Sequence, residues 1–214
     1  MILSRGRRYI FIHIPKTGGT AMALALEGRA MKDDLMLGDT PKARNRRGRL
    51  DGVSAKGRLW KHSRLADLEG VITADEMSDL FVFTLVRNPW DRVVSYYHWL
   101  QVQTFDHPAV KLAQRVEFDA FVRDPQTRAA FRATPARSYV SDGQGRDQCD
   151  LYIRLEHFEA DAEPLWDHLG FSLRLERANT SSRNADYRPY FDHDSARLIG
   201  EDFAEDVARF SYAF

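Results

Sequence analysis

The sequence has little of several features that define other classes of protein. It contains one cysteine, Cys149, among 214 residues, so no disulfide can form within the chain. No apolar run approaches the roughly 20 residues that a membrane-spanning helix needs, and residues 1–8 do not resemble a signal peptide. Lysine plus arginine and aspartate plus glutamate balance at 31 each, so no overall field attracts nucleic acid or a membrane surface. We therefore expect a cytoplasmic protein without a membrane-spanning segment or a nucleic-acid partner.

One stretch, Tyr9-Ile-Phe-Ile-His-Ile-Pro-Lys-Thr-Gly-Gly-Thr20, has the pattern of a strand followed by a glycine turn. Its first six residues are β-branched or aromatic for the most part, as in a strand that is buried on both faces. Pro15 ends this strand because it fixes φ and has no N–H for the sheet. Gly18 and Gly19 allow a tight turn and a close approach to a ligand.

A helix is expected directly after this turn. Residues 21–27 are mostly strong helix formers, and Thr20 is the expected N-cap. Free N–H groups and the positive end of the helix dipole then point at one place, which suits a phosphate.

The order of residues in this loop differs from that of nucleoside-triphosphate loops. Those loops place Lys-Ser/Thr after the last glycine, so that the hydroxyl can hold Mg²⁺, whereas Lys16 here precedes the glycines. The later strand, Leu80–Arg87, ends in a basic residue and supplies no aspartate for the metal. The pattern therefore argues against metal-dependent phosphoryl transfer, and we expect no metal.

A second stretch, Leu80–Tyr97, begins as a buried strand and continues as a helix opened by Pro89. Arg87 falls at the carboxyl end of the strand, where open α/β sheets bind their ligands. Ser95 lies two turns into the helix and could face the same end, which would suit a second phosphate. Taken alone, however, Arg87 and Ser95 are better explained as a surface pair with Asp91 and a serine on a helix face.

Together the two stretches resemble the sulfotransferases that use 3′-phosphoadenosine 5′-phosphosulfate (PAPS), most closely the carbohydrate enzymes of the heparan 2-O-sulfotransferase type. The resemblance implies that the loop binds the 5′-phosphosulfate and that Arg87–Tyr97 binds the 3′-phosphate, with 3′,5′-adenosine bisphosphate as the product. It also implies that a later loop closes over the nucleotide. The candidate donor-binding residues are Pro15, Lys16, Thr17, Gly18, Gly19, Thr20, Ala21, Arg87, Ser95, Ser181 and Arg183.

The resemblance also implies a general base. His62 matches the family's histidine by its order in the chain and by its Lys-His-Ser context, and the imidazole pKa lies near neutral pH. Lys16 is the second catalytic candidate, since it could stabilise charge on the departing phosphate oxygen. Members of the family often self-associate, so a homodimer is a further expectation.

We predict one domain over residues 1–214 with an α/β fold. Its expected architecture is P-loop-like and three-layered, with a central, mostly parallel sheet flanked by helices. A third strand is predicted at Leu151–Glu156, followed by an amphipathic helix interrupted at Pro164. A last helix over about 194–210 is expected to pack on the sheet, because its apolar residues recur at helical spacing.

The acceptor is expected to be a hydroxyl-bearing molecule, and the basic segment 42–64 points to an anionic glycan. The same segment also fits a solvated loop, and both interpretations stay open. Three other functions are weighed as well: a P-loop kinase-like phosphotransferase, a non-catalytic nucleotide- or glycan-binding module, and a nucleic-acid binder that uses the basic loop.

Overall fold

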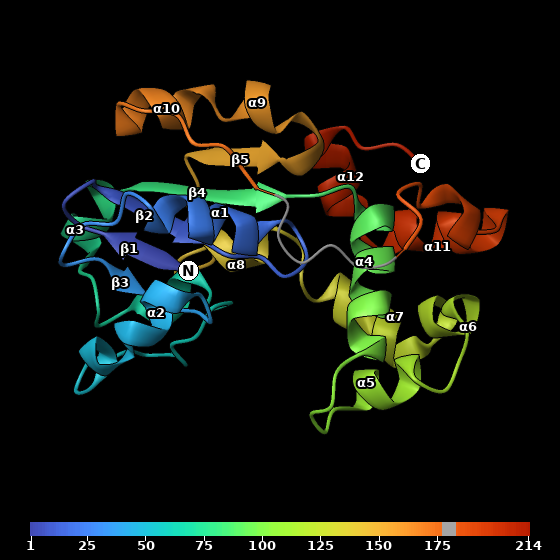
Figure 1. Cartoon of the computed structure of the whole chain (residues 1–214). Helices are drawn as coiled ribbons and strands as arrows, with labels where there is room; N and C mark the ends of the chain where they lie inside the picture. The colour runs from blue at the N-terminus through green and yellow to red at the C-terminus, as the bar shows by residue number, and fades with distance from the viewer. Residues whose placement is uncertain (177–182) are drawn as a thin grey trace. The chain divides into compact units, whose positions relative to one another are not determined.

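The computed structural model describes residues 1–176 and 183–214, which fold as two compact units (Figure 1). The sheet unit comprises Met1–Val86 and the chain from Ala136. The helical unit comprises Arg87–Pro135 and the C-terminal chain from Arg183. Since two such units can belong to one domain, the expectation of a single domain over residues 1–214 stays a prediction.

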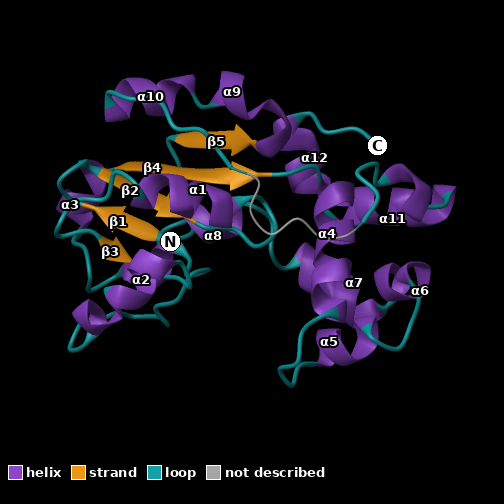
Figure 2. Cartoon of the chain, viewed as in Figure 1, coloured by secondary structure: helices purple, strands orange, loops and turns teal. Residues whose placement is uncertain are grey.

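The described part of the sheet unit contains five strands and a number of short helices (Figure 2). Its elements are β1 (Ile2–Ser4), β2 (Tyr9–Ile12), α1 (Gly19–Glu27), β3 (Leu35–Met36), α2 (Pro41–Asn45), η1 (Arg47–Leu50), η2 (Leu65–Leu68), α3 (Ala74–Ser78), β4 (Phe81–Val86), α8 (Arg137–Val140), β5 (Leu151–Arg154), η3 (Leu155–His157), α9 (Phe158–Asp161) and α10 (Glu163–Leu169).

The described part of the helical unit contains no strand. Its elements are α4 (Pro89–Gln101), α5 (Pro108–Ala113), α6 (Phe118–Arg123), α7 (Pro125–Arg132), η4 (Arg188–Tyr190), α11 (His193–Asp202) and α12 (Ala204–Phe210). No helix among the described residues is long and apolar enough to cross a membrane.

The sheet has the strand order β3-β1-β2-β4-β5. β2, β4 and β5 pair in parallel, with Tyr9 opposite Phe81 and Leu85 opposite Ile153. β1 is antiparallel to both of its neighbours, so it alone runs against the other four strands. The prediction of a mostly parallel α/β sheet is confirmed, whereas the short strands β1 and β3 were not predicted.

Both faces of the sheet are buried. Phe11, Phe83 and Ile153 point to one face and pack in a single cluster with apolar side chains of α1, α9 and α10. Ile10 and Val82 alternate with them along their strands and are at most 1% exposed. A strand that is buried on both faces has a continuous apolar sequence and not an alternating one. The apolar composition of these segments was therefore sufficient to predict where the strands lie.

The C-terminal chain differs from its prediction in two ways. It forms two helices, α11 and α12, which are separated at Phe203. Its apolar residues Ile199 and Phe203 pack with Trp90, Phe121 and other residues of the helical unit, and not on the sheet. The expectation of one helix packed on the sheet was wrong, because helical spacing identifies an apolar face but not the partner of that face.

The helix after β5 is also interrupted two residues earlier than expected, at Ala162 and not at Pro164. α9 ends at Asp161 and α10 begins at Glu163, so Pro164 lies in the first turn of α10. Proline is tolerated at that position because the N–H it lacks would have no partner within the helix.

Asn88 provides a first test of the fold. Its Oδ1 accepts from the N–H groups of Trp90 (3.1 Å) and Asp91 (3.4 Å), and its Nδ2 donates to Tyr187 Oη and to the carbonyl of Ala213. We expect Asn88→Ala to lower the free energy of unfolding by about 1–2 kcal/mol in urea titrations, since a helix cap and buried hydrogen bonds are lost. Asn88→Asp keeps the cap oxygen and should lose less; equal losses in the two variants would contradict this account.

Candidate active site

The loop after β2 reverses the chain through two residues with positive φ. Lys16 has φ 68° and Gly18 has φ 88°, and α1 begins at the next residue, Gly19. Thr17 is buried, and its hydroxyl donates to the carbonyl of Ile14 at 2.9 Å. The Thr17 hydroxyl therefore stabilises the turn that contains Lys16.

Gly18, and not Thr20, is the N-cap of α1, so the predicted cap was wrong. No side chain among the described residues caps this helix. The N–H groups of its first turn are therefore left for a ligand, and the dipole of this nine-residue helix favours a negative charge there. The helix therefore begins two residues earlier than expected, and the anion site at its N-terminus stays a prediction.

Both glycines of the loop lie against other side chains. A Cβ on Gly18 would lie 2.8 Å from Leu155 Cδ1, and a Cβ on Gly19 would lie 2.0 Å from Cδ2 of His13. Real Cβ contacts are essentially never that close. The glycines thus let the loop approach the end of β2 so closely that the ring of His13 packs directly on the start of α1.

His62 is held by the same histidine. Its Nδ1 lies 2.8 Å from the backbone oxygen of His13, and the two ring centroids are 4.5 Å apart. A carbonyl oxygen can only accept, so Nδ1 of His62 carries the proton in the neutral ring and Nε2 keeps its lone pair. The predicted base therefore has its acceptor nitrogen available in the uncharged state.

The charge state of His62 is set chiefly by burial. Burial lowers the pKa of His62 from 6.5 to about 4; the hydrogen bond to His13 opposes this shift, and the Lys61 ammonium adds to it. The pKa of His13 is also lowered, first by its own burial. Both imidazoles are therefore neutral at pH 7.

The neighbours of His62 in the sequence fix the segment around it. Lys61 Nζ lies 2.7 Å from Asp39 Oδ2. Ser63 is fully buried, and its Oγ lies 2.8 Å from the oxygen of Arg58, 2.9 Å from the oxygen of Trp60 and 2.8 Å from the nitrogen of Trp60. The serine of the Lys-His-Ser sequence therefore stabilises, through these hydrogen bonds, the turn that contains His62.

A second cluster of charge lies in the helical unit. Arg87 donates to Asp91 Oδ2 from Nε (2.8 Å) and Nη2 (2.6 Å), while Arg183 donates to Asp91 Oδ1 at 2.5 Å. One carboxylate thus holds two guanidinium groups together, and the three charges sum to +1. The Arg87–Asp91 pair is present as the simpler interpretation predicted, and it also brings in Arg183, a residue inferred only from the resemblance.

Asp91 was not among the predicted site residues. The signal that could have found it is its spacing of four residues from Arg87, which brings the first turn of α4 within reach of the arginine that precedes the helix cap. Ser95 follows one turn later on the same helix and is 7% exposed. Ser181 lies outside the described residues.

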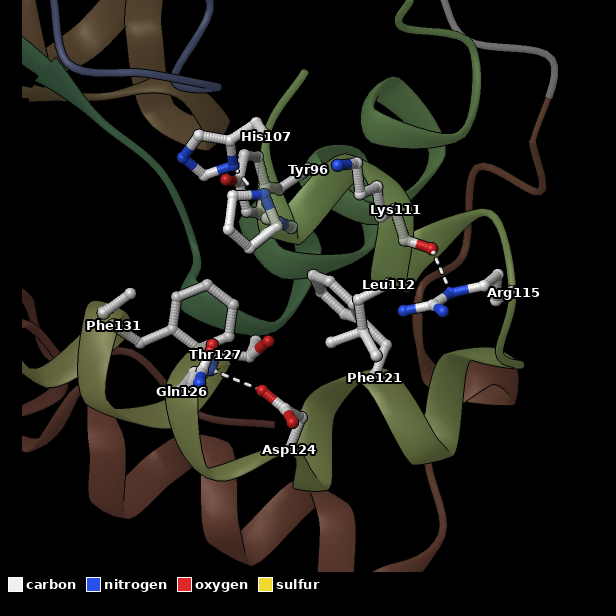
Figure 3. A pocket seen from close by; sticks show the side chains of 13 residues that line it. Tyr96, His107, Lys111, Leu112, Arg115, Phe121, Asp124, Gln126, Thr127 and Phe131 are labelled. Carbon is white, nitrogen blue, oxygen red and sulfur yellow. Dashed lines mark hydrogen bonds between the residues drawn. The ribbon is translucent and has the colours of Figure 1, made fainter. Parts of the chain in front are cut away.

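The helical unit also contains a cavity of about 570 Å³ between α4, α5, α6 and α7. Figure 3 shows Tyr96, Phe121 and Phe131 around it, with Lys111 and Arg115 along one side. None of the site residues predicted from the sequence lines this cavity. Among the described residues, no group of three histidine, cysteine, aspartate or glutamate side chains could hold a metal ion.

The chain belongs to the sulfotransferase family, because the model of that family matches residues 1–213. The predicted enzyme class is thereby confirmed: the protein is a sulfotransferase, an enzyme that transfers sulfuryl groups. A search of curated proteins gave no significant match.

Two solved structures resemble the chain at a distance. The crystal structure of mouse sulfotransferase SULT7A1 complexed with PAP is 14% identical, with a TM-score of 0.49 over 96% of this chain and 85% of that one. A sulfotransferase from Alicyclobacillus acidocaldarius is 17% identical, with a TM-score of 0.38 over 94% and 93%. The family assignment depends on the match of the family model to residues 1–213 and not on these two structures.

The contact between His13 and Gly19 gives a second test. We expect Gly19→Ala to lower the free energy of unfolding by about 1–3 kcal/mol, since the added methyl group must displace a buried ring. Gly28, at the other end of α1, has φ −59° and meets nothing closer than the Ala25 oxygen at 3.4 Å. Gly28→Ala should therefore be neutral or stabilising by up to about 1 kcal/mol. Equal effects in urea titrations would show that the close contact does not exist.

Proposed function

We propose that this sulfotransferase moves a sulfuryl group from PAPS to a hydroxyl group of a carbohydrate or glycoconjugate. The observation that carries the proposal is the hydrogen bond from His62 to His13, the residue whose ring packs on Gly19 of the phosphate loop. A neutral imidazole is thus held next to a loop suited to an anion. That combination is what transfer from a phosphosulfate to a hydroxyl requires.

At the donor end, the loop Pro15–Thr20 and the amide of Ala21 bind the 5′-phosphosulfate. Lys16 and the amides of the first helical turn stabilise the charge that develops on the phosphate oxygen as the sulfur–oxygen bond breaks. These groups supply positive charge at the leaving oxygen, so the proposed mechanism uses no metal ion.

At the acceptor end, Nε2 of His62 takes the proton of the attacking hydroxyl. The acceptor oxygen forms a bond to sulfur, while the bond from sulfur to the phosphate oxygen breaks. The products are the sulfate ester, 3′,5′-adenosine bisphosphate and a protonated His62, which then returns its proton to solvent.

We assign the 3′-phosphate to Arg87, Arg183 and Ser95. Two guanidinium groups that already share one carboxylate can bind a phosphate with paired, charge-assisted hydrogen bonds at little cost in ordering. Ser181 remains a candidate from the resemblance. The 3′-phosphate would distinguish this donor from ATP and from adenylate.

The acceptor is proposed to be an anionic glycan, supported by the basic segment 42–64. A cytoplasmic location and a homodimer are further proposals from the sequence. A non-catalytic nucleotide- or glycan-binding module is the alternative, and it would bind donor and acceptor without needing His62.

Ligand-induced stabilisation tests the donor. We expect 3′,5′-adenosine bisphosphate at 100 times its Kd to stabilise the protein by about 2.7 kcal/mol, and 5′-AMP at the same concentration to do less. Arg87→Ala and Arg183→Ala should weaken binding of the bisphosphate about 10- to 100-fold, since a charged hydrogen bond is lost. They should leave the affinity for 5′-AMP unchanged.

The matched control is Arg197→Ala, which removes an exposed arginine that pairs with Glu201 in the same unit. It should bind both nucleotides as the wild type does. A preference of the wild-type protein for ATP with Mg²⁺ over the bisphosphate would contradict the proposed donor.

The pH dependence of turnover tests the base. Because the pKa of His62 is lowered to about 4, we expect kcat/KM to stay level from pH 8 to about pH 5 and to fall only below it. A fall centred near pH 6.5 would contradict a buried, neutral base. His62→Ala should lower kcat at least about 100-fold with little change in bisphosphate affinity.

Circular dichroism at each pH is the necessary control. The unfolded chain binds a proton at His62 below about pH 6.5, whereas the folded chain does so only near pH 4. Stability is therefore lost as pH falls through this window, by up to about 3 kcal/mol from this residue.

A further inference from the structure

Trp60 is an exposed aromatic side chain next to the proposed base. It is 42% exposed, whereas Trp90 is buried and Trp99 and Trp166 are half-buried. Its ring centroid lies 5.1 Å from that of His62, with the two planes at 86°. A flat, apolar surface therefore lies beside the imidazole of His62.

The position of Trp60 is fixed by its backbone. Its N–H donates to the buried hydroxyl of Ser63, which also lies 2.9 Å from the Trp60 oxygen. His62, between these two residues along the segment, is held by the carbonyl of His13. The indole is thus presented on a preformed turn, which lowers the ordering cost of any ligand that stacks on it.

Arg58 adds a positive charge to this surface. Its guanidinium carbon lies 5.3 Å from the centre of the Trp60 ring, and its side chain is exposed. Two neighbouring lysines are neutralised, since Lys56 pairs with Glu69 and Lys61 with Asp39. Among the residues that the structure describes, Arg58 forms no ion pair and remains available to an anionic ligand.

We propose that Trp60 and Arg58 form an acceptor subsite for a sugar ring that carries a carboxylate or sulfate group. The apolar face of the sugar stacks on the indole, and its anionic group pairs with the guanidinium of Arg58. The short distance between the Trp60 and His62 rings then keeps the stacked sugar close to the imidazole of the proposed base. This inference rests on the proposed function and assigns the residues that select the acceptor.

An anionic sugar fits this pair better than a neutral or purely aromatic acceptor. A phenol would stack on Trp60 but leave the charge of Arg58 unused. A neutral sugar would accept hydrogen bonds from the guanidinium but supply no charge to pair with it. Only a ligand with both a ring and an acidic group uses both side chains.

Binding experiments test the subsite without requiring turnover. The probe is a tetrasaccharide of alternating glucuronate and N-acetylglucosamine, compared with its carboxyl-reduced form and with a carboxyl-reduced, N-sulfated form. Tryptophan emission and calorimetry are recorded with 3′,5′-adenosine bisphosphate present. We expect the charged tetrasaccharides to change the emission of Trp60 and to bind about tenfold more tightly than the neutral one.

Variants separate stacking from charge. Arg58→Gln should weaken binding of the charged tetrasaccharides about tenfold and leave the neutral one unchanged. Trp60→Ala should weaken all three, while Trp60→Phe should retain part of the affinity but lose the change in emission. Arg197→Gln, an exposed arginine of the helical unit, is the matched control and should behave as the wild type.

The outcomes distinguish this inference from the proposed function. If the wild-type protein sulfates a hydroxyl from PAPS but the Arg58→Gln variant binds the charged tetrasaccharides as tightly as the wild type, the subsite alone is overturned. Selective binding of the charged tetrasaccharides without any transfer would support the subsite and overturn the proposed function. Failure of the wild-type protein to bind any charged tetrasaccharide would overturn the subsite directly.

Discussion

The close contact between His13 and Gly19 is the constraint on which the rest of the site depends. It requires glycine at the start of α1, and it brings the first turn of that helix against the end of β2. The backbone oxygen of the same histidine holds Nδ1 of His62. His13, at the end of β2, therefore contacts both the glycine turn and the proposed base, so neither can shift without disturbing the other.

In the helical unit, one carboxylate holds two cationic side chains together. Asn88 caps α4, and Trp90 anchors it by donating from Nε1 to the carbonyl of Ala196 at 2.8 Å. Asp91 then holds Arg87 and Arg183 through both of its oxygens. Residues of the Arg-Asn-Pro-Trp-Asp segment that look like a ligand-binding motif are thus in part structural, and the carboxylate keeps the two guanidinium groups ordered.

Much of the fold and of the candidate site could be predicted from local sequence. The buried strands, the glycine turn with Lys16 and the helix opened by Pro89 follow from composition or from the two motifs, whereas His62 was predicted only from the family resemblance. The features that could not be predicted leave no pattern in the local sequence. The strand β1 is only three residues long. The contact of His13 with Gly19 and the pairing of Asp91 with Arg183 join residues that no motif links.

The central claim is that the protein, without any ligand, already holds a neutral His62 with its proton on Nδ1 and a lone pair on Nε2. Nitrogen-15 NMR of the imidazoles, assigned with a His62→Gln variant and recorded from pH 8 to pH 5, measures this directly. The account predicts a protonated Nδ1 and an unprotonated Nε2 for His62 throughout that range. A protonated Nε2 at pH 7, or a ring that becomes doubly protonated near pH 6.5, would contradict it.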